Sequence, residues 1–282
     1  MKTIIYIISL GHSGSTLLDY LLSHNKSLIS CGEIYNFYSQ KPNTEGTKSK
    51  CSCGQPYSNC ILWSNNFDQA NFSSFYVSIV NKIEEIFPSA LAVVDSSKKK
   101  CALEMLVKLN NQEKIDLKVV YLTKDVREFS ASMKRHLSNK KKGYVPNFIR
   151  FFKWFRFWYK ENLKIYFFLK TNEIDFLQIT YQDLCKKSKE SVDKIYEFAN
   201  IDMKKVLFKI SNNIHIADGN RTKYNLSKNF QVKYDDNWKN DYFCRIFYFV
   251  NLRIRRLNLK FQNSSLLAYK RKRRIAKDLS YS

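Results

Sequence analysis

Residues 11–16 (GHSGST) have the composition of an anion-binding turn. They follow an apolar run at residues 4–8 and precede leucines that recur at helical spacing. A glycine- and serine-rich turn between a strand and a helix directs backbone N–H groups and the helix N-terminus at a negative charge. Ser15 stands where an ATP-type phosphate loop has lysine, so we expect a different mode of anion binding. The alternative is that Gly11 and Gly14 only form a tight turn.

Charged side chains follow three later apolar segments and could supply acid–base or electrostatic chemistry. Glu33 ends one such segment, and Lys98 and Lys124 follow the segments 90–95 and 118–123. If these segments are strands of one open α/β sheet, their carboxyl ends meet at the ligand-binding edge. A carboxylate there can accept a proton, and a lysine can neutralise a leaving anion. The alternatives are that Glu33 caps a helix or pairs with a lysine, and that Lys98 lies in a solvated helix start.

Three of the seven cysteines, Cys51, Cys53 and Cys60, fall within ten residues. This spacing fits a local staple or a metal site. Zinc would require a fourth ligand, which Cys31 or a histidine would have to supply. Three unbonded structural cysteines explain the pattern equally well, so the sequence alone assigns no metal.

Short apolar segments alternate with segments of helical spacing, and this alternation predicts an α/β fold. We expect a three-layer sandwich with a central, mainly parallel sheet of about five strands and helices on both faces. Residues 1–240 would form a single domain with insertions at about 36–70, where the polar sequence predicts a loop, and at about 140–170, and residues 241–282 would form a basic helical extension. The expected strands are 4–8, 27–33, 90–95, 118–123 and 175–180.

The chain is strongly basic: 48 Lys and Arg against 25 Asp and Glu give 282 residues a net charge of +23. This charge favours anionic partners such as a nucleotide, an acidic glycan or a lipid surface; we do not expect nucleic acid. The N-terminal apolar run is too short for a signal peptide, and no stretch is long enough to span a membrane. The sequence therefore predicts a cytoplasmic protein, with peripheral membrane contact as a further option.

Residues 148–170 combine aromatic side chains with cations that recur every three or four positions. Such a helix could lie on an anionic membrane. The alternative is that the aromatic arc packs against the sheet and only the basic stripe is exposed to solvent. The basic tail, with KRKRR at 270–274, is open to the same two interpretations: lipid contact or a solvated terminus.

Several segments together resemble sulfotransferases that use 3′-phosphoadenosine 5′-phosphosulfate (PAPS). GHSGSTLL resembles their 5′-phosphosulfate loop, KDVREFSAS at 124–132 their 3′-phosphate motif, and ITYQDL their Tyr-Glu-Asp-Leu segment. CSCGQPYSNCILW, VVDSSK and HIADGNRTK, with the later Trp238, are similar to features of a bacterial-type branch. The matches occur in order over residues 3–240. The chain departs from the pattern at Lys124 (Arg in the family), Val126 (Pro) and His12 (a basic residue).

The resemblance implies a fold similar to P-loop NTPases and transfer of a sulfuryl group from PAPS to a hydroxyl or amine, with no metal required. It implies Glu33 as general base, with His12 as the alternative, and Lys98 as the group that neutralises the departing oxygen. The implied donor-binding residues are Gly11, His12, Ser13, Gly14, Ser15, Thr16 and Leu17 at the 5′ end, and Lys124, Ser132, Arg221 and Lys223 at the 3′-phosphate.

Two other functional classes stay open. One is a P-loop kinase-like enzyme, which the missing loop lysine disfavours. The other is a non-catalytic, basic, membrane-associated binding protein. The acceptor of a sulfotransferase cannot be chosen from the sequence: a carbohydrate, a lipid-linked glycan, or a phenolic or peptide group fits equally well. A homodimer through exposed aromatics of 148–170 is a further option.

Overall fold

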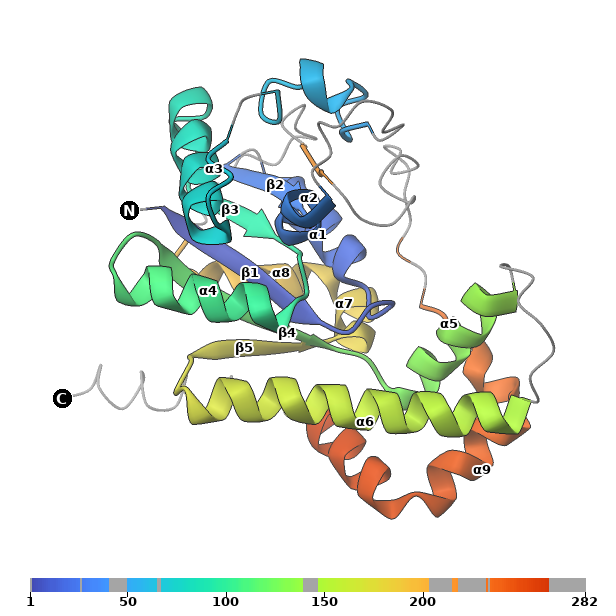
Figure 1. The fold of residues 1–282 in the computed structure, drawn as a ribbon. Helices are drawn as coiled ribbons and strands as arrows, with labels where there is room; N and C mark the ends of the chain where they lie inside the picture. Colours follow the sequence, from blue (N-terminus) through green and yellow to red (C-terminus); the bar gives the residue numbers. More distant parts are fainter. Residues whose placement is uncertain are drawn as a thin grey trace.

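A computed structural model describes residues 2–25, 27–40, 50–64, 67–138, 147–202, 215–217, 232 and 234–263. Its centre is a five-stranded sheet in the order β2-β3-β1-β4-β5, in which every pair of neighbours is parallel (Figure 1). The expected α/β class and parallel sheet are therefore confirmed. The strands are β1 (Thr3–Ser9), β2 (Leu28–Gly32), β3 (Ala92–Asp95), β4 (Asp116–Thr123) and β5 (Phe176–Thr180).

Both faces of the sheet are covered, which explains why the strands are apolar without alternation. Successive side chains of a strand point to opposite faces. In β1, Ile4, Tyr6 and Ile8 belong to one core cluster and Ile5 and Ile7 to the other. The central strand thus supplies both core layers.

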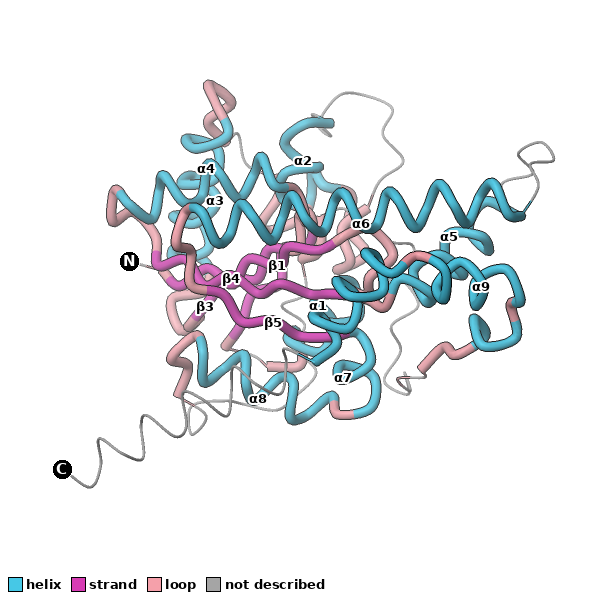
Figure 2. The backbone as a smooth tube through the Cα atoms, turned by 90° about the horizontal axis from the view of Figure 1, so that it is seen from below, coloured by secondary structure: helices cyan, strands magenta, loops and turns pink. Residues whose placement is uncertain are grey.

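The two helical layers are separated clearly in the view from below (Figure 2). One face carries α3 (Phe72–Ile86), α4 (Lys100–Asn111) and α6 (Asn147–Thr171), whose apolar residues join the larger core cluster. The other face carries α1 (Ser15–Ser23), α7 (Tyr181–Lys186) and α8 (Ser188–Phe198). The expected three-layer sandwich is confirmed.

The segment read as a loop from residue 36 begins instead within a helix, α2 (Ile34–Gln40). Its aromatic residues explain the difference: the Phe37 ring lies 4.4 Å from that of Trp63 and 5.0 Å from that of Tyr57. Burial of these three rings against one another stabilises the short helix. A further short helix, 3-10 in type, spans Tyr57–Asn59.

Residues 241–263 pack closely against the domain, whereas the basic run at 270–274 lies outside the described residues. α9 (Tyr242–Val250) contacts α6, and residues 252–263 are helical. Asn258 and Phe261 are fully buried, and the Phe261 carbonyl accepts a hydrogen bond of 2.7 Å from Gln178 of β5. Residues 252–263 are therefore packed against the core through buried side chains, unlike a solvated tail.

The aromatic segment at 148–170 lies within α6, a helix of 25 residues. Phe151, Phe155 and Trp158 are buried in the core, whereas Phe152 and Phe157 are exposed. The aromatic arc therefore packs in the core on one side of the helix, and further aromatic side chains are exposed on the other side. None of the described helices has the length and apolar character required to cross a bilayer.

Candidate active site

The candidate site lies where the strands end, and each strand contributes to it. The turn 11–14 follows β1, Glu33 follows β2, and Lys98 lies three residues past β3. Lys124 directly follows β4, and Tyr181 directly follows β5. Because all five strands are parallel, these residues gather at one edge of the sheet, where open α/β folds bind ligands.

The turn after β1 leaves the start of α1 open. Gly14 is the N-cap residue with φ +95°, a conformation that favours glycine, and no side chain caps this end among the described residues. Leu18 N–H donates to the Gly14 carbonyl (3.0 Å), so the N–H groups of the preceding helical residues have no partner within the helix. Such N–H groups at a helix N-terminus are a favourable place for an anion.

Tyr181 packs against this turn. A Cβ atom added to Gly14 would lie 2.5 Å from Cδ2 of the Tyr181 ring. The ring is positioned by its helix, because the Thr180 hydroxyl caps α7 by accepting from Asp183 N–H (3.0 Å). Gly14 is therefore required both by its backbone angle and by the close approach of Tyr181.

Lys124 lies beneath the same turn and is 6% exposed. Its Nζ donates to the His12 carbonyl (3.3 Å) and lies 3.8 Å from the centroid of the Tyr181 ring. Burial lowers the pKa of Lys124. The ring of His12, itself in a left-handed conformation (φ +64°), stacks at a tilt on His136 of α5 (Val126–Ser138), with centroids 4.6 Å apart. The structure thus brings His12, Gly14 and Lys124 together.

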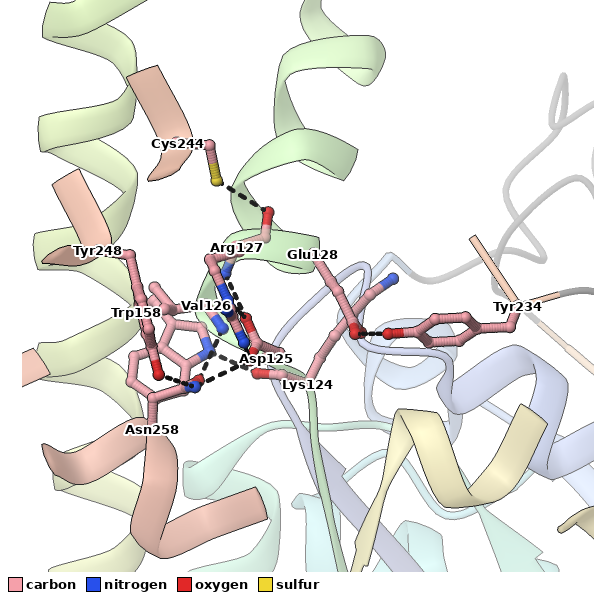
Figure 3. A network of polar contacts seen from close by, with 10 residues as sticks. All are labelled: Lys124, Asp125, Val126, Arg127, Glu128, Trp158, Tyr234, Cys244, Tyr248 and Asn258. Carbon is pink, nitrogen blue, oxygen red and sulfur yellow. Dashed lines mark hydrogen bonds and ion pairs between the residues drawn. The ribbon is translucent and has the colours of Figure 1, made fainter. Parts of the chain in front are cut away.

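A polar network fixes the start of α5 next to Lys124 (Figure 3). Arg127 makes two hydrogen bonds to the Asp125 carboxylate (2.9 and 2.6 Å), and its guanidinium lies between the rings of Trp238 and Tyr248 (4.2 and 4.1 Å). Asn258 donates to Asp125 (2.9 Å) and accepts from the Val126 N–H (2.9 Å). Arg127 is therefore engaged with protein groups, whereas Lys124 contacts the turn through the His12 carbonyl.

Ser132 lies further along α5 and is half-buried. Within the described part of the chain, no hydrogen bond joins it to Lys124. Arg221 and Lys223 lie outside the described residues.

Glu33 and Lys98 form an ion pair on the opposite side of β1 from Lys124. Glu33 is buried, and its second carboxylate oxygen accepts from the Asn36 amide. Lys98 has φ +64°, an uncommon angle for a residue with a side chain. Its loop is held by Asp95, which accepts from Ser97 N–H (2.8 Å), and by the Ser97 hydroxyl, which accepts from Tyr35 N–H (2.9 Å). A strained lysine in a braced loop is typical of a functional position.

A buried carboxylate, Asp19, connects the two sides of the site. It lies on α1 and accepts hydrogen bonds from the hydroxyls of Ser30 at β2 and Ser96 after β3 (2.7 Å for the second). Burial raises the pKa of Asp19 to about 6, although both hydroxyls favour its charged form. Asp19 therefore ties the helix that begins at the anion turn to the loop that carries Lys98. Sequence reasoning missed it, since one carboxylate in an amphipathic helix resembles a surface residue.

Sequence reasoning also missed Glu128, the buried neighbour of Lys124. One carboxylate oxygen accepts from the Tyr234 hydroxyl, and the other is buried without a partner among the described residues (Figure 3). Burial, followed by the charge of Asp125, raises the pKa of Glu128 to about 7. The only signal in the sequence for Glu128 was its position directly after residues 124–127.

No protein-family model and no curated protein sequence matches the chain. Several solved structures are similar to it. The sulfotransferase domain from the curacin biosynthetic pathway is 18% identical with a TM-score of 0.47, covering 88% of this chain and 97% of its own. A sulfotransferase from Alicyclobacillus acidocaldarius is 11% identical, with a TM-score of 0.47 and coverages of 72% and 82%. Sulfotransferase STF1 from Mycobacterium tuberculosis is 13% identical, with a TM-score of 0.43 and coverages of 72% and 68%.

Proposed function

We propose that the chain is a sulfotransferase that moves the sulfuryl group of PAPS to a hydroxyl or amine. One arrangement carries this proposal: an uncapped helix N-terminus at the centre of the sheet edge, with Lys98 and Glu33 on one side and Lys124 on the other. A donor with a phosphosulfate at one end and a separate 3′-phosphate requires two cationic positions of this kind. The sequence motifs support the same assignment.

The reaction needs a base and a cation, and the Glu33–Lys98 pair offers both. In the proposed step, the acceptor oxygen attacks sulfur and its proton passes to the Glu33 carboxylate. The bond between sulfur and the bridging oxygen breaks, and its electron pair stays on the 5′-phosphate of the product. Lys98 stabilises this charge as it develops. By analogy with phosphoryl transfer, positioning and electrostatics then supply most of the rate enhancement.

The two ends of the donor would be held by different groups. The open N–H groups at the start of α1 and the hydroxyls of Ser15 and Thr16 suit the 5′ end. Lys124, buried beneath the turn, suits the 3′-phosphate, and Ser132, Arg221 and Lys223 are proposed to complete that pocket. His12 is the alternative base, since it lies in the turn itself.

We also propose that the protein lies on anionic membranes through α9 and the outer side of α6. Exposed apolar side chains gather on and just after α9: Tyr242, Phe243, Ile246, Phe249, Val250 and Leu252. Cations accompany them: Arg255 lies over the Phe249 ring (6.0 Å), and Lys153, Arg156 and Lys160 border a hollow with Phe152 and Phe157. An apolar surface rimmed by cations is complementary to an anionic lipid surface.

The test of the enzymatic proposal is calorimetric titration with 3′-phosphoadenosine 5′-phosphate, the product nucleotide, at two salt concentrations. No magnesium and no chelator are added. We expect saturable binding with one ligand per chain that weakens in Lys124→Ala. Absence of binding by a folded protein would contradict the proposal. Magnesium-dependent ATP turnover would instead support a kinase-like enzyme.

A further inference from the structure

Three cysteines and a histidine from distant parts of the chain converge beside β2. The ligand atoms of Cys51, Cys53, Cys60 and His215 all lie within 4.8 Å of one another. Cys53 Sγ lies 3.8 Å from Cys60 Sγ, and His215 Nδ1 lies 3.3 Å from Cys60 Sγ and 3.8 Å from Cys51 Sγ. None of the cysteines is in a disulfide. The histidine is the fourth ligand that the sequence alone did not identify.

These spacings are those of a tetrahedral zinc site. With Zn–S bonds of about 2.3 Å and Zn–N bonds of about 2.0–2.1 Å, tetrahedral angles place two sulfurs about 3.8 Å apart and sulfur and nitrogen about 3.5 Å apart. The three contacts of 3.8, 3.3 and 3.8 Å lie close to these values, and the other pairs of ligand atoms lie within 4.8 Å. Cys31, the other candidate ligand, is not part of the cluster.

A tight backbone turn at residues 51–55 brings the cysteine side chains together. Gly54 N–H donates to the Cys51 carbonyl (3.0 Å), and Cys51 N–H donates to the Gln55 carbonyl (2.9 Å), which forms a tight turn around Cys53. Gly54 has φ +88°, as such a turn requires. Cys60 is the C-cap residue of the short helix Tyr57–Asn59. Cys51 and Cys60 are buried, while the exposed Cys53 leaves a path for metal entry.

The histidine is held by main-chain contacts, independently of the cysteines. His215 N–H donates to the Ser30 carbonyl of β2 (3.2 Å), and its own carbonyl accepts from the Trp63 indole (2.7 Å). Ala217 N–H donates to the Cys31 carbonyl (2.9 Å), so residues 215–217 lie along β2. A histidine fixed in this way presents Nδ1 to the sulfurs at little entropic cost on metal binding.

We propose that Cys51, Cys53, Cys60 and His215 bind one Zn²⁺ ion in a closed, structural site. Four protein ligands leave no open position for a substrate, so the ion would act on stability and not on catalysis. It would fasten the segment 50–64 and residues 215–217 to β2, the strand that Glu33 follows (Figure 1). The catalytic proposal needs no metal, so the two ideas can fail independently.

The test is zinc content of the untagged full chain, purified without chelator and measured by elemental analysis. We expect one zinc per chain in the wild type and in Cys101→Ser, a control with an exposed cysteine outside the cluster. Cys60→Ser should lose the ion, and His215→Cys should retain it, because four thiolates also bind zinc. Zinc that persists in both Cys60→Ser and His215→Ala would overturn the assignment.

A second measurement uses only the wild-type protein, so the proposal can still be tested if the variants fail to fold. Wild-type protein with its metal exchanged for Co²⁺ should show the intense visible absorption of tetrahedral cobalt with thiolate charge-transfer bands. A mercurial reagent should release zinc in proportion to the thiols it blocks. A wild type that carries no zinc, takes up no cobalt and contains a disulfide between two of the cluster cysteines would refute the site.

Discussion

Lys98 Nζ contacts Glu33 Oε1 in an ion pair that joins the loops after two neighbouring strands, β3 and β2. The two residues are 65 positions apart, so only the parallel sheet brings them together. In the free protein each charge neutralises the other. Under the proposed function, both partners of this pair take part in the reaction, Glu33 as the base and Lys98 as the cation beside the leaving oxygen.

Lys98→Ala should lower kcat by about 10²–10³-fold, the usual effect of removing one preorganised group that stabilises developing charge. Affinity for 3′-phosphoadenosine 5′-phosphate should change much less, because the open end of α1 and Lys124 remain. The measurement is single-turnover sulfuryl transfer at saturating donor, combined with calorimetry of nucleotide binding.

Lys99→Ala is the matched control, since the neighbouring Lys99 is exposed to solvent. It should keep both activity and nucleotide affinity. Equal losses in the two variants would mean that general positive charge, and not the position of Lys98, explains the effect.

Glu33→Gln should reduce kcat by about 10²–10⁴-fold, the range attributed to general-base assistance. Glutamine preserves the side-chain shape and still accepts a hydrogen bond from Asn36. Donor affinity should therefore stay close to that of the wild type. If Glu33→Gln is active and His12→Ala is not, the base is His12.

Gly14→Ala should destabilise the fold by about 1–3 kcal/mol, because a side chain at positive φ is strained. It should also weaken nucleotide binding, since the new Cβ would lie 2.5 Å from the Tyr181 ring and displace it from the turn. Thermal unfolding and calorimetry measure the two effects.

Gly11→Ala supplies the comparison within the same turn. A Cβ at Gly11 would meet nothing within 4 Å, and Gly11 has no positive φ. We expect nearly normal stability and binding. A Gly11→Ala variant as damaged as Gly14→Ala would show that the Tyr181 contact is not the cause.

The fold and the position of the turn 11–14 before α1 could be predicted because their signals are local. Buried parallel strands appear as continuous apolar runs, and residues just past their ends must gather at one edge. Glu33, Lys98 and Lys124 were therefore identified from position alone. The contacts between these residues could not be predicted. They depend on the strand order, which is a property of the whole sheet and separates Lys124 from the Glu33–Lys98 pair.

The residues that sequence reasoning missed depend on distant partners. Asn258 meets Asp125 across 133 positions, and His215 meets Cys60 across 155. Neither pairing produces a periodic pattern in the sequence from which it could be predicted. α2 was read as loop because its stability comes from aromatic contacts with Tyr57 and Trp63, not from helix propensity.

Nucleotide affinity should depend on the protonation of Glu128. Its pKa in the folded protein is about 7, so it is mostly neutral below pH 7 and charged above it. A charged Glu128 beside Lys124 would repel the 3′-phosphate of the nucleotide. The affinity for the nucleotide should therefore fall as pH rises from about 6.5 to 8. The decrease is up to roughly tenfold if the repulsion is worth one pKa unit. Glu128→Gln should flatten this dependence in calorimetric titrations.

The same substitution should change the pH dependence of stability. A carboxyl whose pKa is raised on folding binds more protons in the folded state, so its contribution to stability falls as pH rises from its unfolded pKa to about 7. Thermal melts of wild type and Glu128→Gln should therefore diverge in favour of the variant as pH rises from about 4.5 to 7, and their difference should stay constant at higher pH. Parallel melting curves across this range would contradict the assigned pKa.

Membrane contact should depend on the apolar tip of α9. Phe249 and Val250 are 71% and 62% exposed, and their replacement by serine should abolish co-sedimentation with anionic vesicles. Binding of the wild type should weaken with salt and be poor on neutral vesicles, because cations such as Arg255 interact with the lipid charge. Ile61→Ser, which alters another exposed apolar residue (56%) far from α9 in the chain, should bind normally. A concentration-dependent dimer that dissociates in the α9 variant, with no vesicle binding by the wild type, would assign the surface to a second copy of the chain.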